Sequence, residues 1–272
     1  MSPIEQSIKR KIEAVGTPLK DWDIQINYGI KTGCNEAFII TTEKREEILS
    51  NCQSEDERQR TAELIRPILR GRDIKRYGYV DSGLYLINTH NGIRGRIPRI
   101  NIDDYPAVKA HLNRYWNKIE KRTDKGDTPY NLRNCAYLED FYKPKVIYPN
   151  MTKYMPFVYD DKEYITNQKC FIITGKYVAF LTAFLNSSLF KYCFRDSFPE
   201  LQGGTREMSK IFFDKIPVVN IDDEIEKEFT SLICDIQNEY TQDKAIHIDK
   251  RIFDLYKLSN HEREIIGFVE IS

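Results

Sequence analysis

The sequence predicts an α+β protein with a mixed, largely antiparallel and curved sheet, flanking helices and a C-terminal helical appendage. Up to residue 219, short segments rich in β-branched and aromatic residues alternate with helical patterns, and turn residues separate them. After residue 219, the apolar residues follow helical spacing alone. We therefore expect two parts: a body over residues 1–219, and a helical segment over residues 220–272 that packs on the body or on a partner domain.

The strands of the body are predicted wherever a short apolar run lies between turn signals. Residues 31–35, Lys-Thr-Gly-Cys-Asn, form the first such turn, because glycine and asparagine tolerate unusual backbone angles. The strands expected in the body cover residues 24–30, 36–41, 79–88, 145–149, 157–159 and 169–174.

The helices of the body are predicted from apolar residues that recur every three or four positions. In the clearest case Pro106 suits a first turn, and Val108, Leu112 and Ile119 share one face. The helices expected in the body cover residues 43–68, 102–122 and 177–194.

The C-terminal segment shows only helical signals. Phe229, Ile233 and Ile236 are spaced as on one helix face, and a second helix is expected over residues 247–256. Ser259 followed by Glu262 is a capping box, which predicts a third helix start.

Charge is divided unevenly between the two parts, although the chain is neutral overall with 41 basic and 41 acidic residues. Residues 220–272 hold 13 acidic and 6 basic residues, a net charge of −7, so the body carries +7. The densest basic stretch is residues 66–99, with eight Arg or Lys against two Asp. This asymmetry favours a polyanion as the partner of the body.

The sequence argues against a membrane-spanning protein, a secreted protein and a disulfide-bonded protein. No apolar run approaches the roughly 20 residues of a membrane helix, and the first residues lack a signal-peptide pattern. The six cysteines have no paired spacing, so we expect a cytoplasmic protein with reduced thiols.

Each catalytic template fails on a missing residue. Residues 261–265 begin like a zinc-protease helix, but Ile265 stands where the second histidine is required. There is no glycine-rich phosphate loop, and no Asn/Asp-Pro-Pro-aromatic sequence of the kind that adenine N6-methyltransferases need. We therefore expect no catalytic residue, no metal site and no bound cofactor in this chain.

One nuclease-like pattern remains as an alternative. Asp160-Asp161-Lys162 has the acid-x-lysine form in which a carboxylate holds magnesium and the lysine assists the attacking water. The same tripeptide also reads as a charged hairpin tip between two strands.

Polar segments between the strands have the composition of a recognition surface. Residues 69–77 combine four cations with a glycine and a tyrosine, and arginine can fork onto guanine or clamp a phosphate. Residues 150–156 and 164–169 mix amides, hydroxyls, cations and aromatics, and Asn167 with Gln168 could read adenine. Residues 202–206 add a glycine-rich loop with Arg206. Loops held by a sheet commonly carry such surfaces.

The order of these segments resembles the TaqI-like C-terminal specificity domain of type IIG restriction–modification N6-adenine methyltransferases. The resemblance spans residues 21–272. Its matching segments are residues 29–38 (GIKTGCNEAF), 65–74 (IRPILRGRDI), 143–149 (KPKVIYP), 185–190 (LNSSLF) and 204–208 (GTREM), which leads into 216–218 (IPV).

The resemblance implies a target-recognition fold that grips DNA opposite a methyltransferase domain. That domain would use S-adenosylmethionine, and some members of the family also carry a nuclease domain, which would use Mg²⁺. Both catalytic parts are absent from this sequence, so we expect a fragment or a split subunit.

Three hypotheses follow: a DNA-recognition module with catalysis elsewhere, a magnesium-dependent nuclease using Asp160 and Lys162, or a protein-interaction module docking on a methyltransferase subunit. Gly29, Gly33 and Gly71 are expected to shape the backbone. The candidate DNA-contacting residues are Lys31, Thr32, Asn35, Arg70, Arg72, Lys75, Arg76, Tyr77, Lys153, Tyr154, Asn167, Gln168 and Arg206.

Overall fold

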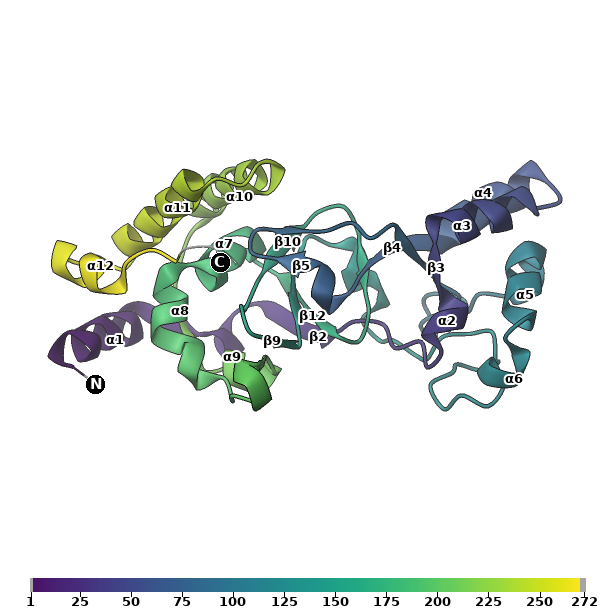
Figure 1. Ribbon diagram of the computed structural model, residues 1–272, viewed down its shortest axis with the longest axis horizontal. Coiled ribbons are helices and arrows are strands. Elements are labelled where there is room, and N and C mark those ends of the chain that lie inside the picture. Colours follow the sequence, from purple (N-terminus) through teal and green to yellow (C-terminus); the bar gives the residue numbers. More distant parts are fainter. Residues whose placement is uncertain (1, 270–272) are drawn as a thin grey trace.

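Two four-stranded sheets occupy the middle of an elongated molecule (Figure 1). The computed structural model describes residues 2–269. The first sheet has the order β10 (Val158–Asp160), β8 (Lys145–Pro149), β12 (Cys170–Gly175) and β2 (Ile24–Tyr28). The second sheet has the order β11 (Ile165–Thr166), β4 (Ile65–Leu69), β7 (Leu84–Ile87) and β3 (Ile39–Thr41).

Antiparallel pairing dominates, which confirms the predicted α+β class. Within the two sheets only β11 and β4 run parallel. Three short antiparallel pairs complete the strands: β1 (Gly16–Pro18) with β14 (Pro217–Val219), β5 (Ile74–Lys75) with β6 (Gly78–Tyr79), and β9 (Met151–Thr152) with β13 (Arg206–Glu207).

The first sheet is buried on both faces. Along β8, Val146 and Tyr148 enter one hydrophobic core, and Ile147 between them enters the other. Along β12, Phe171 and its neighbour Ile172 divide in the same way. Successive residues of a strand point to opposite faces, so a strand covered on both sides needs a continuous apolar run. This is why these two strands could be predicted so closely from the sequence.

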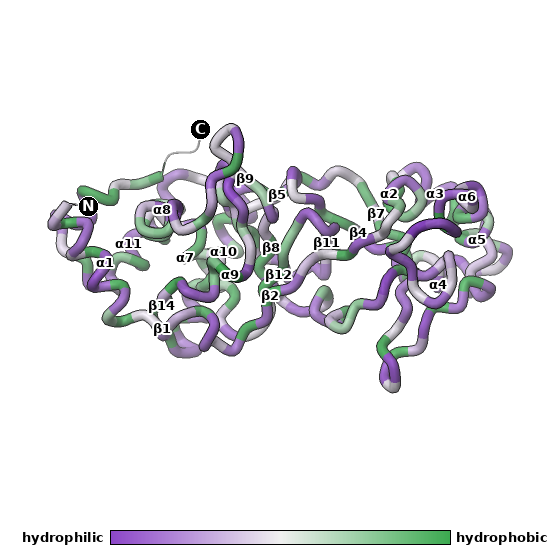
Figure 2. Tube along the Cα trace, turned by 90° about the horizontal axis from the view of Figure 1, so that it is seen from below, coloured by the Kyte–Doolittle hydropathy of each residue, from purple (hydrophilic) through white to green (hydrophobic). Residues whose placement is uncertain are grey.

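One core lies between the first sheet and a group of seven helices, namely the N-terminal helix and six helices from the last hundred residues. It is covered by α1 (Pro3–Val15), α7 (Val178–Asn186), α8 (Ser188–Phe194), α9 (Lys210–Phe213), α10 (Asp223–Asn238), α11 (Gln242–Leu255) and α12 (Asn260–Ile266). Figure 2 shows hydrophobic segments gathered around α7, α10 and the strands of this sheet. Phe180 of α7 meets Phe229 of α10 edge to face, with ring centroids 4.9 Å apart. Residues before and after residue 219 share this core. A division into two domains at residue 219 stays a prediction.

The second core lies between the two sheets and a group of helices at the opposite end of the molecule (Figure 1). These helices are α2 (Asn35–Phe38), α3 (Thr42–Ser50), α4 (Glu55–Leu64), α5 (Pro106–Asn113) and α6 (Trp116–Ile119). Short 3-10 turns at 19–21, 71–73, 102–104, 138–142, 195–197 and 202–204 connect the elements of the whole chain. No helix in residues 2–269 combines the length and the apolar character that crossing a membrane requires.

Five predicted elements differ from the structure. The strand expected over residues 79–88 divides into β6 and β7, with residues 80–83 between them outside any strand. The strand expected over residues 36–41 begins as α2, and the helix expected over 43–68 divides into α3 and α4 before ending as β4. The helix expected over 102–122 is interrupted between α5 and α6. The long apolar helix breaks at Ser187, whose extended backbone lets its hydroxyl accept from Phe190 N and cap α8.

The predicted capping box at Ser259 and Glu262 is confirmed, and it also ties the two chain ends together. The Glu262 carboxylate accepts hydrogen bonds from Lys11 Nζ (2.6 Å), Ser259 N (2.7 Å) and Ser7 Oγ (3.0 Å). Burial of this carboxylate favours the protonated form, but these donors outweigh it and lower the pKa of Glu262 to about 2.

We predict that Glu262→Gln reduces the acid sensitivity of folding. A carboxyl whose pKa is lower in the folded than in the unfolded state stabilises the fold above its unfolded pKa, near 4.5, and loses this contribution as the pH falls toward about 2. Urea unfolding at several pH values should therefore show the wild-type advantage over Glu262→Gln shrinking across this window. Glu264→Gln, an exposed change on the same helix, serves as the control. A pH-independent difference would contradict the assignment.

Candidate nucleic-acid interface

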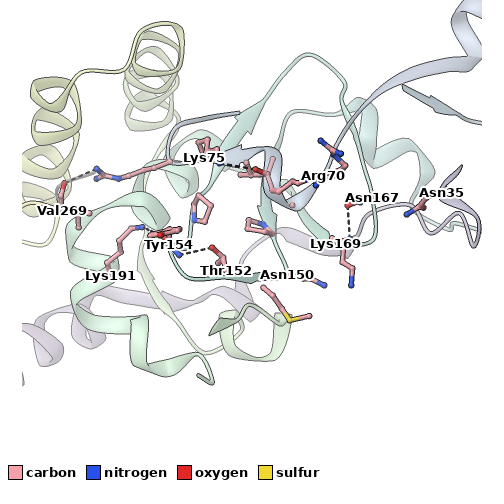
Figure 3. Close-up of a pocket in the computed structure, with 17 residues that line it drawn as sticks. Asn35, Arg70, Lys75, Asn150, Thr152, Tyr154, Asn167, Lys169, Lys191 and Val269 are labelled. Atoms are coloured by element: carbon pink, nitrogen blue, oxygen red, sulfur yellow. Dashed lines mark hydrogen bonds between the residues drawn. The ribbon is translucent and has the colours of Figure 1, made fainter. Parts of the chain in front are cut away.

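A basic cavity of about 990 Å³ lies where three loops from the two sheets meet (Figure 3). We name these loops the basic turn (residues 70–76), the polar loop (150–156) and the amide turn (166–169). Among the described residues that line the cavity, none is acidic and six are cations: Arg70, Arg72, Lys75, Arg76, Lys169 and Lys191. Such a concentration of basic side chains attracts a polyanion.

The basic turn is held in shape by a buried carboxylate. Arg70 forks onto Asp73 through Nε (3.0 Å) and Nη2 (2.9 Å), and Ser82 Oγ donates to the same carboxylate at 2.8 Å. Burial alone would raise the pKa of Asp73, but these donors lower it, so the carboxylate stays ionised. Arg70 is therefore largely engaged within the protein, whereas Arg72 and Lys75 are exposed at the cavity.

The end of the basic turn is less accessible than its sequence suggests. The Arg76 side chain is half-buried and donates to main-chain carbonyls of the protein. Tyr77 has a positive φ of 55° and is only 1% exposed, inside the core beside the first sheet. We therefore no longer count Tyr77 among the residues that can contact DNA.

The polar loop presents two large side chains to solvent. Thr152 Oγ1 accepts from Tyr154 N (3.0 Å) and Met155 N (3.3 Å), which folds the loop back on itself. Tyr154 is 70% exposed and Met151 is 48% exposed, and both line the cavity. Lys153, between them in the chain, is exposed.

The amide turn is packed closely against its neighbours. Asn167 is 7% exposed, and its side-chain oxygen accepts from Lys169 N at 3.1 Å. Gly29 is needed here, since a Cβ on it would lie 2.0 Å from the Asn167 carbonyl oxygen. Gly71 likewise brings the basic turn next to the amide turn, because a Cβ there would lie 3.0 Å from the Lys169 carbonyl oxygen. Gln168, half-buried, belongs to the same turn.

The side chains of the turn at residues 31–35 lie in different places: one lines the cavity, and others contact the neighbouring loop. Asn35 lines the cavity and lies at one end of the row of side chains, with Lys191 and Val269 at the other (Figure 3). Thr32 is buried and bonds Asn35 at 2.6 Å, and Lys31 pairs with Asp124 at 2.9 Å. Gly33 has a φ of 68°, which favours glycine.

Arg206 supports the interface from inside. It is 8% exposed, and it donates to the Phe198 carbonyl (2.9 Å) and pairs with Glu200 (3.1 Å) and Asp196 (3.0 Å). Its strand β13 pairs with β9 of the polar loop. Arg206 therefore braces the polar loop, and its side chain is not presented to a ligand.

Four polar residues of the cavity were not among the candidates from the sequence: Asn150, Thr152, Lys169 and Lys191. Asn150, Thr152 and Lys169 lie within segments that the sequence singled out as polar, so their neighbours pointed to them. Lys191 had no such signal, because it stands in the apolar run of α8. Only the packing of α8 against the polar loop brings its amine to the cavity.

The comparisons with known proteins agree with this geometry. The family model described as the TaqI-like C-terminal specificity domain matches residues 66–218, more than half of the chain. The chain belongs to this family. The match includes the basic turn, the polar loop and the amide turn, so every lining residue of the cavity except Asn35 and Val269 lies within it.

Two solved structures share the fold of this specificity domain. The type IIG restriction endonuclease BpuSI aligns over 94% of the chain, with 13% identity and a TM-score of 0.54. The type IIL restriction–modification enzyme MmeI, solved in complex with DNA, aligns over 92%, with 13% identity and a TM-score of 0.62. The chain spans 33% and 35% of these two proteins, about a third of each.

The nuclease-like tripeptide has a structural role in the specificity domain. Asp160 accepts from Lys145 Nζ at 2.6 Å, and also from the main-chain nitrogens of Lys162 and Tyr164. Both members of the Lys145–Asp160 pair are almost fully buried. Within the described residues, no group of three or more His, Cys, Asp or Glu side chains is placed to hold a metal. The geometry therefore does not support magnesium chemistry at Asp160.

We predict that Lys145→Met destabilises the domain by about 3–5 kcal/mol, because it leaves the Asp160 charge buried without its partner. Burial lowers the pKa of Lys145, so this site disfavours an unpaired charge. Urea unfolding measures the loss, and the double variant Lys145→Met/Asp160→Asn should recover much of it. Lys162→Met, in which the lysine is exposed and follows Asp160 closely in the chain, is the matched control. Equal stability of Lys145→Met and wild type would contradict this role.

Proposed function

We propose that this chain is the sequence-specific DNA-recognition module of a restriction–modification adenine methyltransferase, with catalysis carried by other domains or subunits. The observation that carries the proposal is the basic cavity: the exposed cations Arg72, Lys75 and Lys169 line it, together with Asn35, Asn150 and Asn167. Cations hold phosphates and set the register, and amides and arginines read base edges in the major groove. The loops are fixed by two sheets, as a recognition surface requires.

The division of labour follows from exposure. Arg72, Lys75, Lys153 and Lys169 are exposed, so they are the candidates for phosphate contacts. Tyr154 offers a large exposed ring beside them, able to pack on a sugar or a base edge. S-adenosylmethionine, and Mg²⁺ where cleavage occurs, would bind to the catalytic parts, and the fused or associated methyltransferase is the second partner besides double-stranded DNA.

The first test measures DNA binding by salt titration. A pool of random duplexes should be enriched for one sequence by the pure chain, and binding of that sequence should weaken steeply with salt. Arg72→Gln should lower the salt slope by about one, the value expected for one lost phosphate contact. Lys250→Gln, an exposed change on α11 outside the cavity, should leave the slope unchanged. No enrichment, or equal slopes for both variants, would rule out this surface.

The second test concerns the methyl-transfer partner. Mixing the chain with the methyltransferase part of its own enzyme and S-adenosylmethionine should place N6-methyladenine within the enriched sequence. At sub-saturating concentrations, Arg72→Gln should reduce that methylation more at low salt than at elevated salt, because a lost phosphate contact also lowers the salt dependence of binding. Methylation of other bases, or at random sites, would count against the adenine-specific assignment.

A further inference from the structure

The junction between α7 and α8 contacts both loops that carry most of the cavity. Asn186, the last residue of α7, is buried and joins to the end of the polar loop: its Oδ1 accepts from Phe157 N at 3.0 Å, and its Nδ2 donates to Phe157 O at 2.7 Å. The same Phe157 carbonyl accepts from Tyr77 N at 3.2 Å. Phe157 therefore connects the end of the polar loop, the end of the basic turn and the last residue of α7.

Arg76 makes a second connection at this junction. Its Nε and Nη2 donate to the Asn186 carbonyl at 3.2 and 3.1 Å, and its Nη1 lies 3.4 Å from both Tyr240 Oη and the Val269 carbonyl. The last carbonyls of a helix lack main-chain donors and carry partial negative charge, so a guanidinium there is favourable. The side chain therefore engages protein acceptors on three segments of the chain, although it also lines the cavity.

Lys191 makes the third connection, from α8 to the polar loop. Its Nζ donates to the carbonyls of Tyr154 (2.7 Å) and Met155 (3.2 Å), as Figure 3 shows for Tyr154. Met155 has a φ of 50°, a conformation that a non-glycine residue keeps only when its surroundings hold it. Burial, with Arg76 nearby, lowers the pKa of Lys191 to about 7, although Asp249 opposes the shift.

We infer that Arg76 and Lys191 are positioning residues: through the α7–α8 junction they hold the basic turn and the polar loop at a fixed spacing, and the discrimination between DNA sequences depends on that spacing. The inference rests on the proposed function, in which the two loops read one DNA site. Base readout needs donors and acceptors placed to within a fraction of an ångström, whereas phosphate attraction tolerates displacement. Loss of a positioning residue therefore lowers specificity and leaves the salt slope intact.

The test compares Arg76→Lys and Arg76→Gln with the same changes at Arg72, which is exposed on the same turn. In the DNA-free protein, hydrogen exchange of residues 150–157 should be about tenfold faster in both Arg76 variants, as expected for the loss of one or two hydrogen bonds. Neither Arg72 variant should change it. Both Arg76 variants should also lose about tenfold in preference for the enriched sequence over a scrambled one, the loss corresponding to about 1.4 kcal/mol.

The salt slope separates the two roles. Arg72→Gln should lower it by about one, whereas Arg76→Gln should leave it unchanged. Lys191→Gln provides a second variant in case Arg76 variants unfold, and it should speed exchange in residues 150–157 with wild-type salt dependence. A slope lowered by about one in Arg76→Gln, with unchanged exchange, would make Arg76 a phosphate contact and overturn the inference. If wild type shows no sequence preference, the proposed function fails, and the exchange data still decide whether these residues position the loops.

Discussion

The burial of one sheet on both faces is the constraint on which the interface depends. Because β8 and β12 contribute side chains to two cores, a shift of either strand by one residue would move each side chain into the opposite core and disrupt the packing of both. The polar loop follows β8 and the amide turn precedes β12. The sheet therefore fixes the positions of the polar loop and the amide turn. Gly71 lets the basic turn approach them closely enough to complete one cavity.

The arginines at this surface differ in how far they are engaged within the protein. Arg70 is engaged by Asp73, Arg76 by main-chain carbonyls, and Arg206 by Phe198 and two carboxylates. The planar fork of arginine suits such multiple contacts, which a lysine amine cannot copy. The more exposed cations, among them Arg72, keep their charge available to a ligand. A count of basic residues along the sequence therefore overestimates the number that face a polyanion.

The periodicity and the caps could be predicted from the sequence, whereas the direction of individual side chains could not. Continuous apolar runs identified β8 and β12, and Ser259 with Glu262 identified the start of α12, because both signals are local. The exposures of Tyr77 and Arg206 depend on contacts with residues distant in the chain, which polarity does not reveal. Lys191 was missed for the same reason, since its acceptors lie on a loop more than thirty residues earlier.

The acidic character of the C-terminal segment has a structural explanation within the domain. Glu226 accepts from Ala179 N and Phe180 N at the start of α7, and Asp249 accepts from Ser188 N at the start of α8. Carboxylates at these positions satisfy main-chain donors that the helices leave unpaired, and they oppose the positive end of the helix dipole. Since Glu262 acts in the same way on α12, three of the thirteen acidic residues point into the protein. The negative charge of the C-terminal segment therefore arises partly from helix capping.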